Sequence, residues 1–227
     1  MAKPALRVLR TGGLYFDGRD DYVDLTKSSS GFEEYTLIGR FKTTSIAPDT
    51  SHGFRIITVH KAASSTLVSI GLRAANIFFL FYDGTALIFL TVPKVYNDGE
   101  YHFLAGSVKN GEQKLYFDGS LVGTWDYPFT TRTTTYTDKI ATFDGTYGNF
   151  SGLIDEPRIY KRALTDAEIS EIYTKGTFIK DGLVLCLPFH EHEGNIAHDV
   201  SGYNNHGTIY GANWVVKKAL RVLPKAG

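Results

Sequence analysis

In the first 160 residues, short apolar and β-branched runs alternate with polar turn residues, a pattern typical of β-strands. Runs with the length and alternation of a strand are residues 14–16, 22–25, 35–44, 54–60, 66–72, 77–82 and 86–92. Asp83 and Gly84 lie between two of them and favour a two-residue hairpin turn. The pattern therefore predicts an all-β fold whose strands are connected mainly by tight turns.

The most informative stretch holds three further apolar runs that two turn dipeptides connect. These runs are residues 102–108, 114–117 and 121–125. The connecting dipeptides are Asn110-Gly111 and Asp118-Gly119, which favour two-residue hairpin turns because all four residues tolerate positive φ. Three strands joined in this way form an antiparallel meander, which favours a sandwich or barrel over a parallel α/β sheet.

One helix is predicted after residue 164. Thr165 can cap its N-terminus, and Glu168, three residues later, completes a capping box. Gly176 favours a C-terminal end at this position. The residues that we expect on the buried side of the helix are Ala167, Ile169, Ile172 and Tyr173.

Composition excludes several classes of protein. The 227 residues include 24 basic and 24 acidic side chains, so no net charge attracts nucleic acid or an anionic membrane. The single cysteine, Cys186, excludes an internal disulfide and lies in an apolar run, which predicts a buried thiol. No apolar run approaches the ~20 residues of a membrane span. The first residues do not resemble a secretory signal.

Three groups of motifs together resemble one known family. They are FDG at 16–18 with DYV at 21–23, DGEYH at 98–102 with KLYFDG at 114–119, and GLIDEPRIY at 152–160 with RALTDAEI at 162–169. This combination resembles the laminin-G-like, concanavalin A-like jelly-roll family. The resemblance implies one antiparallel jelly-roll β-sandwich with one short α-helix over residues 1–227. Tyr101 replaces the family's usual Trp, and Pro157 interrupts a strand, so we expect Pro157 at an edge or a bulge.

The order of the motifs differs from that of the family. Residues 182–223 resemble the segment with which members usually begin, so the chain resembles a circular permutation or a piece of a tandem array. The sequence ALRVL at residues 5–9 also recurs at residues 219–223. One copy could pair with a neighbouring chain and form a head-to-tail homo-oligomer, as in a virion or extracellular assembly. Alternatively, the extra copy is inert.

Catalysis is not the function that the residues favour. A retaining glycoside hydrolase needs two facing carboxylates, and the alternating acids Glu191 and Glu193 lie in a stretch that predicts a loop. Asp20 and Asp24 are four positions apart, but only Tyr22 lies between them on that strand face. The histidines around these glutamates, His190, His192 and His198, could bind zinc, although a solvated loop explains them as well.

Calcium is the metal that the resemblance favours. Related modules hold a structural calcium beside an acid on the last strand, a position that Asp155 matches. Asp17, in the matching early turn, is the second candidate ligand. The alternative is that Asp155 only hydrogen-bonds to the backbone at a strand edge.

Recognition of a glycan or a surface protein is what the resemblance most often implies. Aromatic candidates for a sugar platform are Trp125, Tyr127, Tyr136 and Tyr147, in or beside the Thr-rich region 126–149. The alternative is that these rings seal the edge of the sandwich. We therefore expect a non-catalytic recognition or adhesion module, stabilised by calcium if the metal site exists, outside the cell or on a cell or virion surface, without membrane insertion or nucleic-acid binding.

Overall fold

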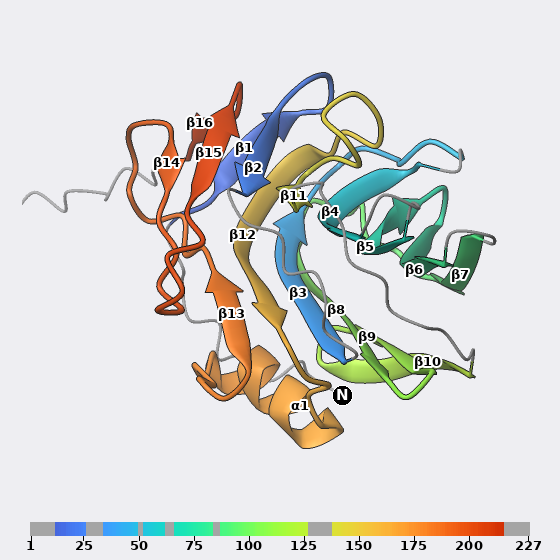
Figure 1. Ribbon diagram of the computed structural model, residues 1–227. Coiled ribbons are helices and arrows are strands. Elements are labelled where there is room, and N and C mark those ends of the chain that lie inside the picture. Colours follow the sequence, from blue (N-terminus) through green and yellow to red (C-terminus); the bar gives the residue numbers. More distant parts are fainter. Residues whose placement is uncertain are drawn as a thin grey trace, which may run out of the picture.

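A computed structural model describes residues 12–25, 34–49, 52–61, 66–83, 87–126 and 138–215. In these ranges the chain forms two antiparallel β-sheets that pack face to face, with one helix outside the sandwich (Figure 1). The predicted fold class, an all-β sandwich with one short helix, is confirmed.

The sheet that carries the helix, called sheet A, has eight strands. They are β1 (Leu14–Asp17), β3 (Tyr35–Lys42), β8 (Tyr101–Lys109), β9 (Glu112–Phe117), β10 (Ser120–Asp126), β12 (Ser151–Tyr160), β13 (Leu183–Cys186) and β16 (Asn213–Trp214). Their order across the sheet is β10-β9-β8-β3-β12-β1-β16, and β13 also pairs with β12. Strand β10 therefore forms one edge of sheet A, and β16 forms the other.

The facing sheet, called sheet B, also has eight strands. They are β2 (Tyr22–Leu25), β4 (Phe54–Lys61), β5 (Thr66–Arg73), β6 (Asn76–Asp83), β7 (Leu87–Pro93), β11 (Lys139–Ile140), β14 (Ile196–Ala197) and β15 (Gly207–Tyr210). Their order is β14-β15-β2-β11-β4-β5-β6-β7. Strand β7 is the edge that lies on the same side of the sandwich as β10.

The predicted meander is formed by β8, β9 and β10, which pair in antiparallel register. Both connecting dipeptides have positive φ throughout: 51° at Asn110, 91° at Gly111, 48° at Asp118 and 76° at Gly119. This is the backbone that matches the right-handed twist of paired strands, and Asn, Asp and Gly adopt it most readily. The turn residues thus explain why three consecutive strands pair locally.

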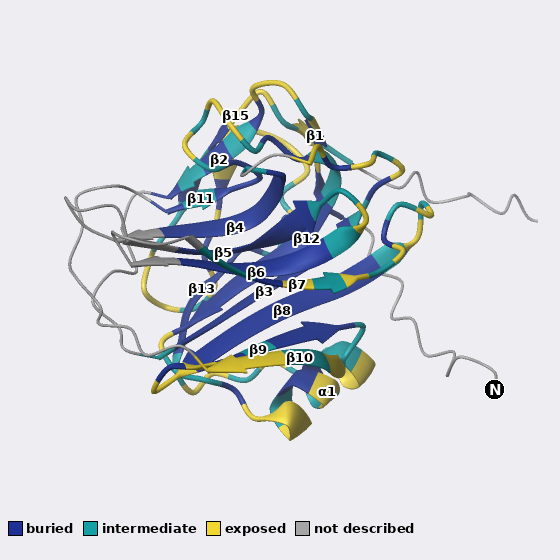
Figure 2. Cartoon of the chain, turned by 90° about the vertical axis from the view of Figure 1, so that its right-hand side faces the viewer, coloured by how far each residue is buried: buried dark blue, intermediate teal, exposed yellow. Residues whose placement is uncertain are grey.

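The core has two main parts. The larger part fills the space between the sheets and includes Phe16, Phe41, Phe79, Leu104 and Leu115. The second part lies between the outer face of sheet A and the helix, and it includes Phe103, Tyr116, Tyr160, Ile169 and Ile172. The central strands of sheet A are therefore buried on both faces (Figure 2).

Helix α1 (Asp166–Lys175) begins and ends where the sequence predicts. The hydroxyl of Thr165 accepts a hydrogen bond from the Glu168 N–H, Glu168 reaches back to the Thr165 N–H, and Gly176 has the left-handed conformation of a C-cap. Ile169 and Ile172 are buried as expected. The expectation for Ala167 was wrong: it is exposed, because at about 100° per residue it lies almost opposite Ile169 around the helix.

Strand β12 contains a bulge at Pro157. Its register against β3 shifts between Asp155 and Arg158, and Glu156, just before the proline, has φ of 48°. Pro157 therefore has no hydrogen bond to donate to the ladder, while its carbonyl accepts one from Leu187 N–H at 3.1 Å. The expectation that Pro157 lies at an edge or a bulge is confirmed, and the structure shows a bulge.

The last two strands of the chain pair with the first two strands. β16 pairs with β1, β15 pairs with β2, and Val215 N–H donates to the Gly13 carbonyl at 3.0 Å. Cys186, in β13, is a buried free thiol as expected. The permuted order of residues 182–223 stays a prediction, and the repeated segments 5–9 and 219–223 lie outside the described residues.

Candidate functional site

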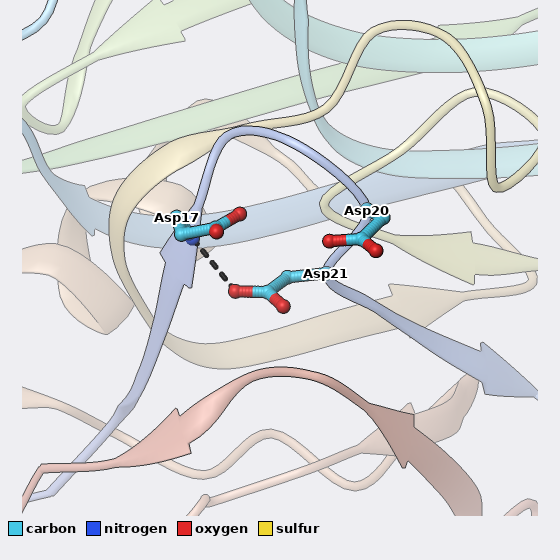
Figure 3. Close-up of side chains that lie close together, drawn as sticks. All are labelled: Asp17, Asp20 and Asp21. Atoms are coloured by element: carbon cyan, nitrogen blue, oxygen red, sulfur yellow. Dashed lines mark hydrogen bonds between the residues drawn. The ribbon is translucent and has the colours of Figure 1, made fainter.

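Three carboxylates gather in the tight turn between β1 and β2, and this group is called the acidic turn. One ligand oxygen from each of Asp17, Asp20 and Asp21 lies within 4.8 Å of the others (Figure 3). The turn is fixed locally, because Asp17 accepts from Arg19 N–H at 2.8 Å and Asp21 accepts from Asp17 N–H at 2.7 Å. Gly18, with φ of 85°, supplies the conformation that the reversal requires.

The acidic turn is electrostatically strained. Asp21 is buried, while Asp17 and Asp20 are exposed. Burial raises the pKa of Asp21, the hydrogen bond from Asp17 N–H opposes this shift, and the neighbouring charges of Asp17 and Asp20 add to it. The amide of Asn149 also donates to the Arg19 carbonyl and ties the turn to the loop before β12. A cation at this place would relieve the repulsion between the carboxylates.

Tyr22, directly after this turn, stacks on Tyr210, and these two residues are called the tyrosine pair. Tyr22 of β2 is the register partner of Tyr210 of β15, and their ring centroids lie 4.7 Å apart at 18°. Tyr210 is 45% exposed. The Lys139 ammonium lies 5.1 Å from the Tyr22 ring centroid and 3.0 Å from the Asp24 carboxylate. A flat aromatic surface thus lies beside an ion pair on the outer face of sheet B.

This combination is chemically suited to sugars. The faces of aromatic rings pack against the C–H faces of pyranoses, and neighbouring charged groups hydrogen-bond to hydroxyls. Because Asp21 directly precedes Tyr22 in the chain, the acidic turn and the tyrosine pair share one end of β2. A metal bound by the turn would therefore also stiffen the strand that carries the pair.

Of the four predicted aromatic residues, the structure describes Trp125 and Tyr147, and these two lie apart. Trp125 lies in edge strand β10 and is 47% exposed. Tyr147 lies in the loop between β11 and β12, which is well apart from β10 (Figure 1). Its ring stacks on that of His52, with the ring centroids 5.0 Å apart. Tyr127 and Tyr136 lie outside the described residues.

The two predicted calcium ligands lie apart along one strand pair. Asp17 pairs with Ser151 at one end of β1, whereas Leu14, at the other end, pairs with Ile154, next to Asp155. At ~3.3 Å per residue, four positions of β12 separate them by about 13 Å. Asp17 belongs to the acidic turn, and Asp155 is buried in β12. Calcium binding by either residue stays a prediction.

The other candidate acids and histidines do not join the acidic turn. Glu191 accepts from His198 N–H at 2.6 Å, while Glu193, His190 and His192 are exposed. In the described part of the chain, the acidic turn is the one group of three metal-ligand side chains that lie together. Asp24 pairs with Lys139 rather than with Asp20.

The tyrosine pair was not predicted from the sequence. Alternation along residues 22–25 places Tyr22 and Asp24 on the same outward face, which is a usable signal. Tyr210 could not be found in this way, because its position beside Tyr22 depends on a strand register between distant parts of the chain.

Comparison with known proteins places these features in context. A family model described as the concanavalin A-like lectin/glucanases superfamily matches residues 17–170. No curated protein matches the sequence. In the described ranges, no helix has the length and apolarity needed to span a membrane.

Several solved structures share the fold. A Bacteroides ovatus protein, provisionally described as carbohydrate binding, has a TM-score of 0.69 at 15% identity, over 92% of this chain and 60% of its own length. The heptameric SAP-like pentraxin of Limulus polyphemus has a TM-score of 0.64 at 11% identity, over 92% and 96%. The CBM40 of Ruminococcus gnavus IT-sialidase, bound to α2,3-sialyllactose, has a TM-score of 0.59 at 19% identity, over 71% and 96%.

Proposed function

This chain belongs to the concanavalin A-like lectin/glucanase superfamily, and we propose that it is a non-catalytic carbohydrate-binding module whose ligand stacks on the tyrosine pair. The observation that carries the proposal is the ring of Tyr210, which is 45% exposed and held in place by its stacking on Tyr22. A ring that is fixed before binding loses little conformational entropy when a sugar packs against it.

The ion pair beside the rings supplies polar contacts. Lys139 and Asp24 are 3.0 Å apart and partly exposed, so the carboxylate can accept from a sugar hydroxyl while the ammonium donates to another. Asp24 is held by Lys139, and Asp21 accepts from Asp17 N–H. The ion pair of Asp24 with Lys139 suits the positioning of a ligand, which is the role that we propose for it.

The fold relatives support this proposal. One of them is named as carbohydrate binding and another is a CBM40 bound to α2,3-sialyllactose. We further propose an extracellular or surface location, because that is where a module of this kind meets glycans.

A glycan array with neutral and sialylated glycans tests the proposal. We expect Tyr210→Ala to lose binding of at least one glycan that the wild type and Tyr203→Ala both retain. Tyr203 is a matched control, since it is 47% exposed and its hydroxyl contacts Lys161 rather than the pair. The same preparations should release no reducing sugar from the glycans they bind. Equal binding by both variants, or hydrolysis of a bound glycan, would contradict the proposal.

We also propose that the acidic turn binds calcium. Three carboxylates within 4.8 Å offer the oxygen ligands that Ca²⁺ prefers, and the bound charge would remove the repulsion around Asp21. Calcium at about 100 times its dissociation constant should add ~2.7 kcal/mol of stability, or about 5–10 °C in melting temperature for a chain of this size.

Thermal unfolding with calcium, with magnesium or with a chelator measures this effect. Asp20→Asn should abolish the calcium shift, and without calcium it should melt no lower than the wild type, because one repulsive charge is gone. A calcium shift that survives in Asp20→Asn would contradict the assignment to this turn and would direct attention to Asp155.

A further inference from the structure

The protein's only glutamine is buried, and the described part of the chain offers it no hydrogen-bond partner. Gln113 lies in β9, its exposure is 0%, and neither its amide nitrogen nor its amide oxygen bonds to a described residue. A buried polar group in this state costs about 1–3 kcal/mol, whereas an apolar side chain of the same size would cost nothing. The fold alone does not explain this residue.

The amide points between the sheets, close to their open edge. Side chains alternate along β9, so Gln113 faces the same way as Leu115 and Phe117, which belong to the core between the sheets. Its register partner on the edge strand β10 is Trp125. Paired residues project to the same face of a sheet, so the indole and the amide are neighbours.

The surroundings of this pair are apolar. A side-chain carbon added at Gly123 of β10 would lie 3.1 Å from Val92 and 3.2 Å from Leu90, both in β7. The two edge strands therefore face each other, and β10 forms an exposed margin of the sandwich (Figure 2). Trp125, 47% exposed, lies at this margin.

We propose that Trp125 and Gln113 form a second carbohydrate site, which binds a neutral pyranose. The indole would pack against the sugar ring, and the amide, with two donors and one acceptor group, would hydrogen-bond to its hydroxyls. Because the amide is closed off from solvent in the free protein, binding includes a rotation of the half-exposed indole that opens the way to it. The site uses none of the residues of the tyrosine pair.

The charges and the backbone at this edge favour a neutral sugar. Trp125 and Gln113 carry no charge, and the next register pair, Asp126 with Glu112, adds only exposed carboxylates on the other face of the two strands, so neither pair offers a cation to an acidic sugar. An extended peptide is disfavoured because the register of β10 shifts between Leu121 and Gly123, and a bulge of this kind hinders addition of a further strand.

Isothermal titration with neutral tetrasaccharides built from glucose, galactose, mannose or xylose, and with sialyllactose, tests the site. The measurements use Tyr210→Ala as the background, so that the tyrosine pair does not contribute. We expect Gln113→Leu to weaken binding of the best neutral ligand about tenfold or more while it raises the melting temperature. Trp125→Ala should weaken binding similarly, and Leu121→Ala, a control on the same strand, should leave it unchanged.

The outcomes separate this site from the proposed function. Neutral-sugar binding that persists in Tyr210→Ala and is lost in Gln113→Leu supports the second site. Loss of all binding in Tyr210→Ala overturns it and leaves the tyrosine pair as the site. Unchanged binding by Gln113→Leu, stronger binding of sialyllactose than of any neutral sugar, or a lower melting temperature in Gln113→Leu also overturns it, the last because the amide is then satisfied within the protein.

Discussion

A buried histidine holds two turns of the meander together, and its titration should be visible in the stability of the whole protein. His102 is 6% exposed and stacks on Phe117 at 4.8 Å. Its Nδ1 lies 3.0 Å from the carboxylate of Asp118, and its Nε2 lies 3.1 Å from that of Asp98. The ring therefore links the turn before β8 to the turn after β9.

The direction of the pH effect follows from these contacts. Burial lowers the pKa of His102, but the hydrogen bonds and charges of Asp118 and Asp98 outweigh it, so that the pKa is raised above its usual value. A raised pKa in the folded state stabilises the protein below pH ~6.5, and this stabilisation is lost as the pH rises through the folded pKa. The free energy of unfolding should thus fall between pH 6 and the mildly alkaline range.

Two substitutions separate the charge from the packing. His102→Ala removes one side of a buried ion pair, which typically costs 3–5 kcal/mol; because Asp98 is 40% exposed, we expect about 3 kcal/mol. His102→Gln keeps hydrogen-bonding capacity without a titrating group, so it should cost less and should remove the pH dependence that the histidine causes.

Urea unfolding at steps from pH 5 to pH 9 measures both effects. The quantity to compare is the difference between wild type and His102→Gln, because burial lowers the pKa of His52, whose contribution therefore has the opposite sign. The difference should be largest at pH 5 and should shrink as the pH rises. A difference that is constant over this range, or that grows with pH, would refute the reasoning.

Three further predictions concern β12 and the helix. Glu156→Gln should destabilise by about 3–5 kcal/mol, because it removes the carboxylate charge that lies 2.6 Å from the buried Arg158 guanidinium. The half-exposed Glu171→Gln should change stability by ~0.5 kcal/mol or less, and equal effects would contradict this. Thr165→Ala should cost about 1 kcal/mol through loss of the N-cap, measured by urea unfolding. Arg162 lowers the pKa of Glu168 to about 2, so the stability this acid adds should disappear from pH ~4.5 down to 2, and Glu168→Gln should lack that acid-side slope.

The sequence was sufficient to predict the turns, the start of the helix and the bulge, because residues that are close together in the chain decide these features. Asn110-Gly111 forms the predicted hairpin turn because these residues adopt positive φ at little cost, and Thr165 begins the helix because its capping partner is three residues away. Pro157 was placed at a bulge for an equally local reason, the missing N–H. Each of these interactions is complete within a few residues.

The candidate sites needed information that the sequence does not carry. Tyr22 and Tyr210 become a pair only through the register of β2 with β15, and the burial of Gln113 depends on how β9 packs against the facing sheet. Trp125 was named from its residue type, but its neighbour Gln113 was not, because a polar residue within a strand is usually exposed. Long-range packing decides both the pairing of the two tyrosines and the burial of Gln113.

The pairing of β1 has a consequence for how the chain acquires its structure during synthesis. Leu14 pairs on one side with Ile154 and on the other with Trp214, so the first strand leaves the ribosome long before either partner exists. Local hairpins such as β8–β9 can form early, but β1 must remain without its sheet until the last strands emerge. Chaperones that hold nascent chains would bind this apolar strand while it is unpaired, and the slowest folding step should be its insertion between β12 and β16.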